Sequence, residues 1–228
     1  ICYYSLYNLI YTEPSIFLKR QLLMILNIKI TISLVFLFLT TLLWNPAFSG
    51  EIVNLTLTPK NSSIGFKLDS TFQLVHGNAP KFEGKVQIPK NLNPDEFYVE
   101  VKIPVKDMET ANEKRDKTMH NFCFEMGKYP EIRFESTAFK ELPAKPRKDV
   151  DFEFTLMGNL TIKGITKSIA IPVTIKSKEN SFHASGTVTL NYLKDFNIKD
   201  PSVFILRVAK QVEVFVEVDI PHSLIGNP

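Results

Sequence analysis

One short segment combines the side chains that a nucleophilic site would need. Asp116, His120 and Cys123 are spaced four and three residues apart, which places them on one face of a helix. A thiol beside an imidazole that an acidic group orients could serve as nucleophile and general base. Cys123, however, lies between Phe122 and Phe124 and close to Met126. An apolar environment of this kind favours the unreactive protonated thiol. We therefore interpret Cys123 as a buried structural residue and predict no catalytic residues.

The sequence gives no support to a metal site or a nucleic-acid interface. The histidines at positions 76, 120, 183 and 222 lack the paired spacing of zinc or haem ligands, so we predict no metal and no cofactor other than a bound ligand. The formal net charge of +3 falls to +1 without residues 1–49, which hold three of the 27 basic and one of the 24 acidic side chains. Charge of that size, without a block of like sign, does not attract a polyanion.

The N-terminal segment is typical of an export signal. Lys29 precedes an uncharged apolar run over residues 30–44, and Ala47 and Ser49 supply the small side chains of a signal-peptidase site. We expect residues 24–49 to be a signal peptide that is cleaved after Ser49, which would make the protein periplasmic or secreted. A transmembrane anchor is the alternative, although the run is somewhat short for one. Because Met24 would begin a conventional signal, we expect residues 1–23 to belong to an over-extended reading frame.

Residues 50–228 show the alternation of a β-protein. Between residues 152 and 162 the apolar side chains fall mostly on even positions, and between 165 and 175 they fall mostly on odd positions. A period of two gives each strand one apolar face, and the change of parity predicts a turn at Gly164. Gly158 lies inside the first of these strands, where a glycine is typical of a bulge or a bend.

The same pattern recurs along the domain and predicts an all-β fold. Alternating segments near residues 53–57, 64–68, 97–105, 132–138, 182–192 and 212–218 predict, with the central hairpin, an extended antiparallel up-and-down barrel of about eight strands. One helix interrupts them near residues 110–126. Thr110 and Glu113 predict a capping box at its start, and Gly127 predicts its end.

The central hairpin also resembles a known family. Residues 158–167 read G-N-L-T-I-K-G-I-T-K, which is similar to the G-D/N-L-T-I-x-G-x-T-K signature of the YceI family. Four further steps occur in the family's order: V-H-G at 75–77, F-E-G at 82–84, R-D at 115–116 followed by Y-P-E-I-R-F at 129–134, and K-D-F-N-I at 194–198. Thr118 stands where many members have histidine, and Asn197 replaces a glycine. The resemblance implies a lipocalin-like β-barrel outside the cytoplasm that holds a polyisoprenoid or a similar lipid.

These expectations together define a candidate site. Long antiparallel strands that close into a barrel leave room for one small ligand. The side chains expected to line the lumen are Phe66, Leu68, Phe134, Phe154, Leu156, Leu160, Val188, Leu190 and Tyr192. His76, Arg115 and Asp116 join them because they match family motifs, and we expect Arg115 and Asp116 to form a salt-bridged cap on the barrel mouth.

The function expected from this site is non-enzymatic storage or transport of an isoprenoid, or of a quinone-type lipid. Transient contact with a membrane or a membrane protein, and a homodimer, are compatible with that role. Two alternatives remain open at this point. One is an enzyme or redox accessory that acts on a lipid quinone, and the other is a solid β-sandwich that serves as an adhesion or scaffold module.

Overall fold

The computed structural model describes residues 23–24, 29, 51–143, 146–147 and 150–225. The chain divides into two compact units, Ile1–Ser49 and Gly50–Pro228. Leu23, Met24 and Lys29 are helical, but most of the predicted signal peptide lies outside the described residues. Within the described residues, no helix combines the length and the apolar character that crossing a membrane would require.

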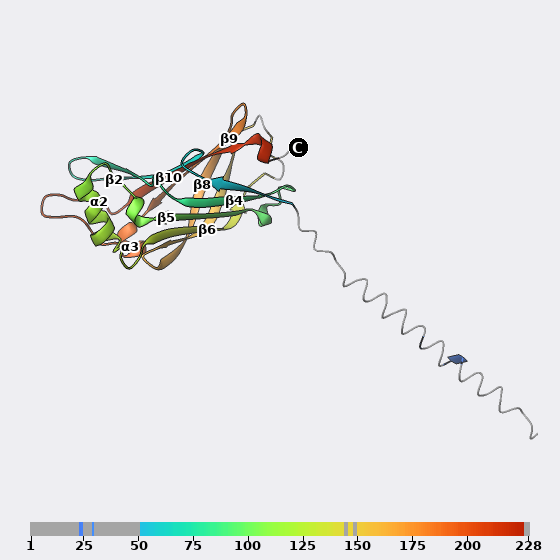
Figure 1. Cartoon of the computed structure of the whole chain (residues 1–228), viewed down its shortest axis with the longest axis horizontal. Coiled ribbons are helices and arrows are strands. Elements are labelled where there is room, and N and C mark those ends of the chain that lie inside the picture. The colour runs from blue at the N-terminus through green and yellow to red at the C-terminus, as the bar shows by residue number, and fades with distance from the viewer. Residues whose placement is uncertain (1–22, 25–28, 30–50, 144–145, 148–149, 226–228) are drawn as a thin grey trace, which may run out of the picture. The chain divides into compact units, whose positions relative to one another are not determined.

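The second unit is built on one ten-stranded antiparallel sheet (Figure 1). Its strand order is β1-β4-β5-β6-β7-β8-β9-β10-β2-β3, so consecutive strands from β4 to β10 form an up-and-down meander. The strands are β1 (Ile52–Leu57), β2 (Ser62–Asp69), β3 (Leu74–Asn78), β4 (Glu83–Pro89), β5 (Tyr98–Pro104), β6 (Glu131–Lys140), β7 (Phe152–Ile162), β8 (Ile165–Ser177), β9 (Ser181–Leu190) and β10 (Val212–Pro221).

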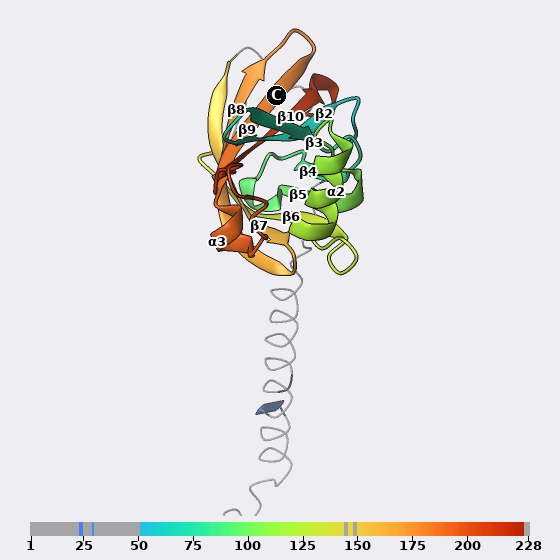
Figure 2. The ribbon, with the colours of Figure 1, turned by 90° about the vertical axis from the view of Figure 1, so that its left-hand side faces the viewer.

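The sheet curls into a half-barrel, which confirms the predicted lipocalin-like all-β class (Figure 2). It has ten strands where the alternation predicted about eight, because β3 (L-V-H-G-N) and β4 (E-G-K-V-Q-I-P) hold too few apolar residues to show the pattern. β1 and β3 are the two edges of the sheet. The end of β3 is covered by the segment after β5, since Asn78 and Glu109 exchange two backbone hydrogen bonds of 2.9 Å.

The predicted turn at Gly164 is present between β7 and β8. Lys163 and Gly164 form a two-residue loop with φ values of 51° and 73°, and Ile162 pairs with Ile165. Two positive φ values are the mark of a type I′ turn, whose twist matches that of the strands it joins. This hairpin runs for eleven paired residues from Phe152 to Ile162 and forms the longest pairing in the sheet.

Gly158 accompanies an irregularity in the neighbouring strand. The pairing of β6 with β7 shifts between Ser136 and Ala138, so the extra residue is Thr137 of β6 rather than Gly158 itself. Gly158 is needed because a Cβ atom there would lie 2.3 Å from the Phe134 ring and 2.8 Å from the carbonyl oxygen of Glu135. The glycine therefore allows the Phe134 ring to pack closely against the backbone of β7.

The predicted helix is shorter than expected and begins differently. Helix α2 spans Glu113–Thr118 and continues as a π-helical segment, Met119–Cys123. Its N-cap is Asn112, whose side-chain oxygen accepts a hydrogen bond of 3.0 Å from the backbone N–H of Arg115. The capping box predicted from Thr110 was wrong, because the hydroxyl of Thr110 bonds to Asp116 instead. The helix also ends before Gly127, and the residue with positive φ is Glu125 (54°).

The remaining helical elements are short. Helix α3, Tyr192–Phe196, follows β9 and is capped by the side chain of Asn191. Single 3₁₀ turns span Pro94–Glu96, Val105–Asp107 and His222–Leu224. Helices α2 and α3 lie at the same end of the barrel (Figure 1), which is the end where the β7–β8 turn contacts both of their connecting segments.

Candidate functional site: an apolar cavity inside the half-barrel

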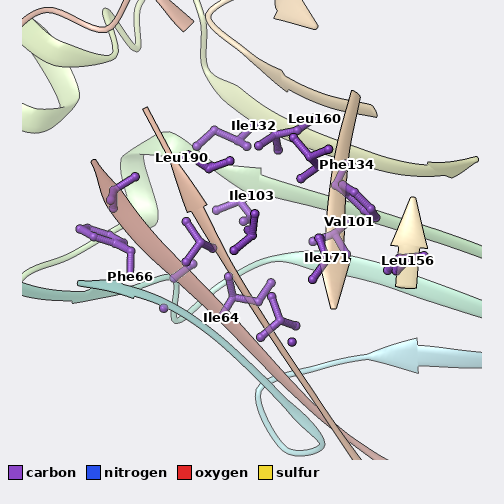
Figure 3. A pocket seen from close by; sticks show the side chains of 18 of the residues that line it. Ile64, Phe66, Val101, Ile103, Ile132, Phe134, Leu156, Leu160, Ile171 and Leu190 are labelled. Carbon is purple, nitrogen blue, oxygen red and sulfur yellow. The ribbon is translucent and has the colours of Figure 1, made fainter. Parts of the chain in front are cut away.

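The concave side of the curled sheet encloses a cavity of about 850 Å³. Side chains from all ten strands contribute to its wall, and most of them are branched aliphatic residues or phenylalanines. Figure 3 shows this wall, where ten labelled side chains from several strands point into a common space: Ile64, Phe66, Val101, Ile103, Ile132, Phe134, Leu156, Leu160, Ile171 and Leu190.

The structure brings together the nine apolar side chains that the sequence placed in the lumen. Each of them lines the cavity: Phe66, Leu68, Phe134, Phe154, Leu156, Leu160, Val188, Leu190 and Tyr192. Eight belong to strands, whereas Tyr192 opens helix α3 and was wrongly assigned to the end of a strand. Its buried hydroxyl donates a hydrogen bond of 2.9 Å to the carbonyl oxygen of Ala209, and burial raises its pKa to about 12.

Strand β7 shows how the alternation produces the wall. Phe152, Phe154, Leu156, Leu160 and Ile162 occupy even positions and face the cavity, while exposed Glu153 lies between the first two on the outer side. The Phe154 ring stacks on Phe139 of β6 with the ring centroids 5.9 Å apart. Stacked aromatic rings and aliphatic side chains thus form a continuous dry surface along the hairpin.

The polar side chains of the wall are concentrated in one segment. Among the described lining residues, the charged and hydrogen-bonding side chains other than Tyr192 and the thiol of Cys123 all come from α2 and the loop before it: Thr110, Asn112, Lys114, Arg115 and Thr118. An otherwise apolar cavity with a few convergent polar groups is typical of ligand sites. The cavity therefore has an amphiphilic character, with its polar part at the α2 end.

Arg115 and Asp116 do not form the salt bridge that we expected. Both residues instead hold Thr110: Arg115 donates from Nε to Oγ1 at 2.8 Å and from Nη2 to the carbonyl oxygen at 2.6 Å. Asp116 accepts from the backbone N–H of Thr110 at 2.9 Å and from its hydroxyl. Arg115 lines the cavity, whereas Asp116 does not. Within the described residues no carboxylate lies within ion-pair distance of Arg115.

His76 lies outside the cavity wall, contrary to its predicted place in the site. It is an exposed residue of β3, whose neighbours Val75 and Gly77 are buried. Gly77 approaches the Phe66 ring so closely that a Cβ atom would lie 2.1 Å from it. The V-H-G step therefore contributes through its glycine, which makes room for a lining phenylalanine, and not through the imidazole.

Cys123 is buried at the cavity wall but has no imidazole partner. Nε2 of His120 lies 2.7 Å from the carbonyl oxygen of Met108, and no hydrogen bond joins it to the thiol. Burial raises the pKa of Cys123 to about 11, so the thiol is protonated near neutral pH. In the part of the chain that the structure describes, no cluster of three or more His, Cys, Asp or Glu side chains could hold a metal ion.

Lys163 has a structural role that sequence reasoning missed. A lysine in a hairpin turn usually points into solvent, but the side chain of Lys163 is only 6% exposed. Its ammonium group donates to Oε1 of Glu125 at 2.9 Å and to the carbonyl oxygen of Asn197 at 3.0 Å. A hydrogen bond from Lys163, which has the larger effect, and another from Lys199 lower the pKa of the Glu125 carboxylate. Lys163 therefore ties the hairpin turn to the segments that follow α2 and α3.

The connection between α3 and β10 also contributes to the wall, and no prediction included it. Five of its side chains line the cavity: Ile198, Pro201, Val203, Leu206 and Val208. The segment lacks a regular period, so its only signal in the sequence is a run of apolar residues at 203–206 between polar neighbours.

Comparisons with known proteins agree with this architecture. A model of the YceI-like domain matches residues 55–220. A UPF0312 protein of Photorhabdus laumondii, plu2095, is 28% identical over 150 residues, which cover 61% of this chain and 72% of that protein. Protein YceI of Salmonella newport is 25% identical over 170 residues, covering 70% of this chain and 81% of that protein.

Two solved structures share the fold at low sequence identity. A polyisoprenoid-binding domain from Saccharophagus degradans, implicated in plant cell wall breakdown, has a TM-score of 0.59 at 13% identity, over 75% of this chain and 99% of that one. BcnA of Burkholderia cenocepacia has a TM-score of 0.57 at 18% identity, over 69% of this chain and 95% of that one. At these identities the likeness concerns the arrangement of the chain.

Proposed function

The chain belongs to the YceI-like domain family, and from this we propose that it is an exported binding protein for a polyisoprenoid or a similar long-chain amphiphile. In this role the apolar chain occupies the cavity of the half-barrel, and the protein stores or transports the lipid without changing it chemically. The fold class and the family are those of binding proteins.

The observation that carries the proposal is the cavity of about 850 Å³ with an almost entirely apolar wall. Pockets for small molecules usually measure about 300–1,000 Å³, so the volume suits a ligand larger than most metabolites. Each buried CH₂ group contributes roughly 0.8 kcal/mol, so ten of them would contribute about 8 kcal/mol before the cost of ordering the chain. A flexible prenyl or fatty chain would gain most from such a wall.

The position of the polar groups supports one orientation of the ligand. Thr110, Asn112, Lys114, Arg115 and Thr118 line the cavity near α2, and the rest of the wall offers few hydrogen-bonding groups. A polar head group left among phenylalanines and leucines would lose its hydrogen bonds to water without replacement. The head group would therefore lie at the α2 end, with the chain extending along the β6–β7–β8 wall.

A catalytic role on a lipid quinone gains no support from the one segment that suggested it. His120 bonds to a backbone carbonyl, and the thiol of Cys123 has a raised pKa. A protonated thiol without a base in hydrogen-bond reach is a poor nucleophile. The existence of a large cavity likewise favours a container over a solid sandwich.

Export is part of the proposal and has its own test. Residues 24–49 have the composition of a signal peptide, and cleavage after Ser49 would release the domain into the periplasm or the medium. N-terminal sequencing of protein secreted by expressing cells should therefore begin at Gly50. A retained leader would favour the transmembrane anchor instead.

The binding function is tested by identifying what the protein carries. We expect mass spectrometry of a solvent extract of freshly purified protein to reveal a long-chain isoprenoid in amounts comparable with the protein. An extract without lipid, from protein that also takes up no added prenyl lipid, would overturn the proposal.

A further inference from the structure

A tight turn between α3 and β10 displays large apolar side chains in water. Val203 and Leu206 exchange two backbone hydrogen bonds of 2.9 Å and 2.7 Å, which leaves Phe204 and Ile205 at the tip. Phe204 is 96% exposed and Ile205 is 78% exposed. Single exposed apolar residues are ordinary, but adjacent bulky ones at a loop tip mark an interaction site.

The backbone conformation of this turn is unfavourable for Phe204. Phe204 has a φ of 33°, in the region that two-residue turns usually fill with glycine or asparagine. The turn would form more readily with a small residue at this position. The phenylalanine is therefore better explained by what its side chain contacts outside the protein than by the conformation of the loop.

A second exposed aromatic residue is held beside the turn. The backbone N–H of Thr71, in the β2–β3 connection, donates to the carbonyl oxygen of Arg207 at 2.9 Å, and the N–H of Arg207 donates to Oγ1 of Thr71 at 2.8 Å. Phe72, the next residue, is 70% exposed. Two loops that are far apart in the sequence thus present their apolar tips from one hydrogen-bonded platform.

This platform is continuous with the cavity. Val203 and Leu206, which flank the tip, both line the cavity, and Val203 is also 59% exposed. The connection between α3 and β10 and the turn between β2 and β3 lie at the end of the barrel that carries α2 (Figure 1). Val203 and Leu206 therefore link the wall of the cavity to the exposed tip of the turn.

We propose that the tip of the turn, Phe204 and Ile205, together with Phe72, docks the barrel mouth onto a phospholipid bilayer. Their side chains enter the acyl region, and the apolar surface through Val203 and Leu206 gives a prenyl chain a dry path between bilayer and cavity. This inference rests on the proposed function, since such a path is useful only to a protein whose ligand dissolves in membranes. The inference adds that the ligand enters the cavity at this end of the barrel and that a bilayer supplies it.

The charged residues near the tip favour a phospholipid bilayer as the surface that it contacts. Arg207 and Lys210 follow the tip in the same connection, whereas Lys199, which precedes the tip, is paired with Glu125 at 3.1 Å. Asp200 is the only acidic residue of the connection. Basic side chains just behind an apolar tip lie at the depth of lipid phosphates when the tip is inserted. The carboxylate of Asp200 is exposed and accepts a hydrogen bond of 2.8 Å from the backbone N–H of Ser202, so Arg207 and Lys210 outnumber it in this connection.

The experiment compares the full exported domain with a variant in which the apolar tip is replaced by small residues that also fit the backbone of the turn. The variant Phe204→Gly with Ile205→Ser supplies residues that a two-residue turn accepts readily, so the fold should be retained. The control Val150→Ser removes an exposed apolar residue, 43% exposed, that precedes β7 at the opposite end of the barrel. Co-sedimentation uses vesicles of equimolar phosphatidylcholine and phosphatidylglycerol.

The wild type and the control should sediment with the vesicles, and the double variant should partition at least about tenfold more weakly, because two apolar side chains no longer enter the bilayer. Uptake of a fluorescent prenyl alcohol separates the two proposals. The double variant should take it up normally from cyclodextrin and slowly from vesicles.

Three results would overturn the inference: equal vesicle binding by variant and wild type, absence of binding by both, or a wild-type dimer that the substitutions dissociate. The last would assign the surface to a second copy of the chain. Failure of the wild type to take up the probe from either source would contradict the proposed function itself.

Discussion

Among the residues that the structure describes, Lys163 is the one charged residue that is buried. It is held by the carboxylate of Glu125 and the carbonyl oxygen of Asn197, and each of the three residues has a positive φ. Nothing in the residues 158–167 indicates this environment, because its two acceptors come from turns that lie 38 and 34 positions away. A local pattern predicts the turn, but tertiary packing decides where its lysine points.

Replacing this lysine should weaken the fold. Lys163→Met keeps most of the side-chain volume but leaves the Asn197 carbonyl without a donor, so we expect the free energy of unfolding to fall by about 1–3 kcal/mol. Lys167→Met, on the exposed face of β8, should change it by less than about 0.5 kcal/mol. Urea denaturation of both variants measures the difference.

The same contact predicts a dependence on pH. The pKa of Glu125 is lowered in the folded protein by its hydrogen bonds to Lys163 and Lys199, so the contribution is present above the ordinary glutamate range and is lost as the pH falls through the folded pKa. The difference in stability between wild type and Lys163→Met should therefore shrink in acid. A difference that stays constant down to low pH would show that the carboxylate takes no part.

Cys123 makes a second prediction at the scale of one residue. Its thiol is buried and its pKa is raised to about 11 by desolvation, so the folded protein should resist thiol reagents near neutral pH and react once denatured. A raised pKa also means that this thiol contributes to stability below its unfolded pKa and loses that contribution as the pH rises toward 11. Rapid labelling of native protein would refute its burial and revive a chemical role.

At the scale of elements, glycine decides how closely neighbouring strands approach. Gly158 and Gly77 each lie beneath a phenylalanine ring from the adjacent strand, namely Phe134 and Phe66, and both rings line the cavity. The sequence indicated that Gly158 was special, but the cause is the ring above it and not a bulge in its own strand. Contacts across a sheet of that kind require the register, which the sequence of one strand does not contain.

Gly158→Ala should therefore be costly. The new Cβ atom would lie 2.4 Å or less from two atoms of the Phe134 ring, and overpacking of this kind usually costs about 1–3 kcal/mol of stability. Gly127→Ala is the matched control, because nothing lies within 4 Å of its added Cβ atom. Chemical denaturation that finds the two variants equally stable would contradict the proposed packing of Phe134.

The helical elements show where local signals compete. Thr110 and Asn112 are both good N-caps, and only the structure reveals that Asn112 caps α2 while Thr110 is held by Arg115 and Asp116. Alternation likewise continues from β9 into Tyr192, although Asn191 has already started helix α3. In each case two local readings were physically reasonable, and contacts from other segments selected one.

At the scale of the whole molecule, alternation predicted the strands but not how far the sheet closes. Every strand predicted from period two is present, and the nine apolar side chains assigned to the lumen line one cavity. The pairing of β1 with β4 and of β2 with β10 joins segments that are distant along the chain, so no local pattern could reveal it. The sheet consequently proved to be an open half-barrel with ten strands.

The proposed binding function also belongs to this scale, because it needs the whole wall. A carboxylate at position 154 would enter a cavity where phenylalanines and aliphatic side chains offer it no partner, and burying an unpaired charge costs several kcal/mol. A prenyl chain could then occupy that part of the wall only beside a hydrated charge. Lys167→Glu is the matched control, since Lys167 is exposed on β8 and does not line the cavity.

The measurement that tests this account most directly is the amount of prenyl lipid bound per molecule by wild type, Phe154→Asp and Lys167→Glu, after circular dichroism has shown all three to be folded. Extraction and mass spectrometry should recover lipid from the wild type and from Lys167→Glu, and little or none from Phe154→Asp. Folded Phe154→Asp protein that carries as much lipid as the wild type would show that the ligand does not occupy this cavity.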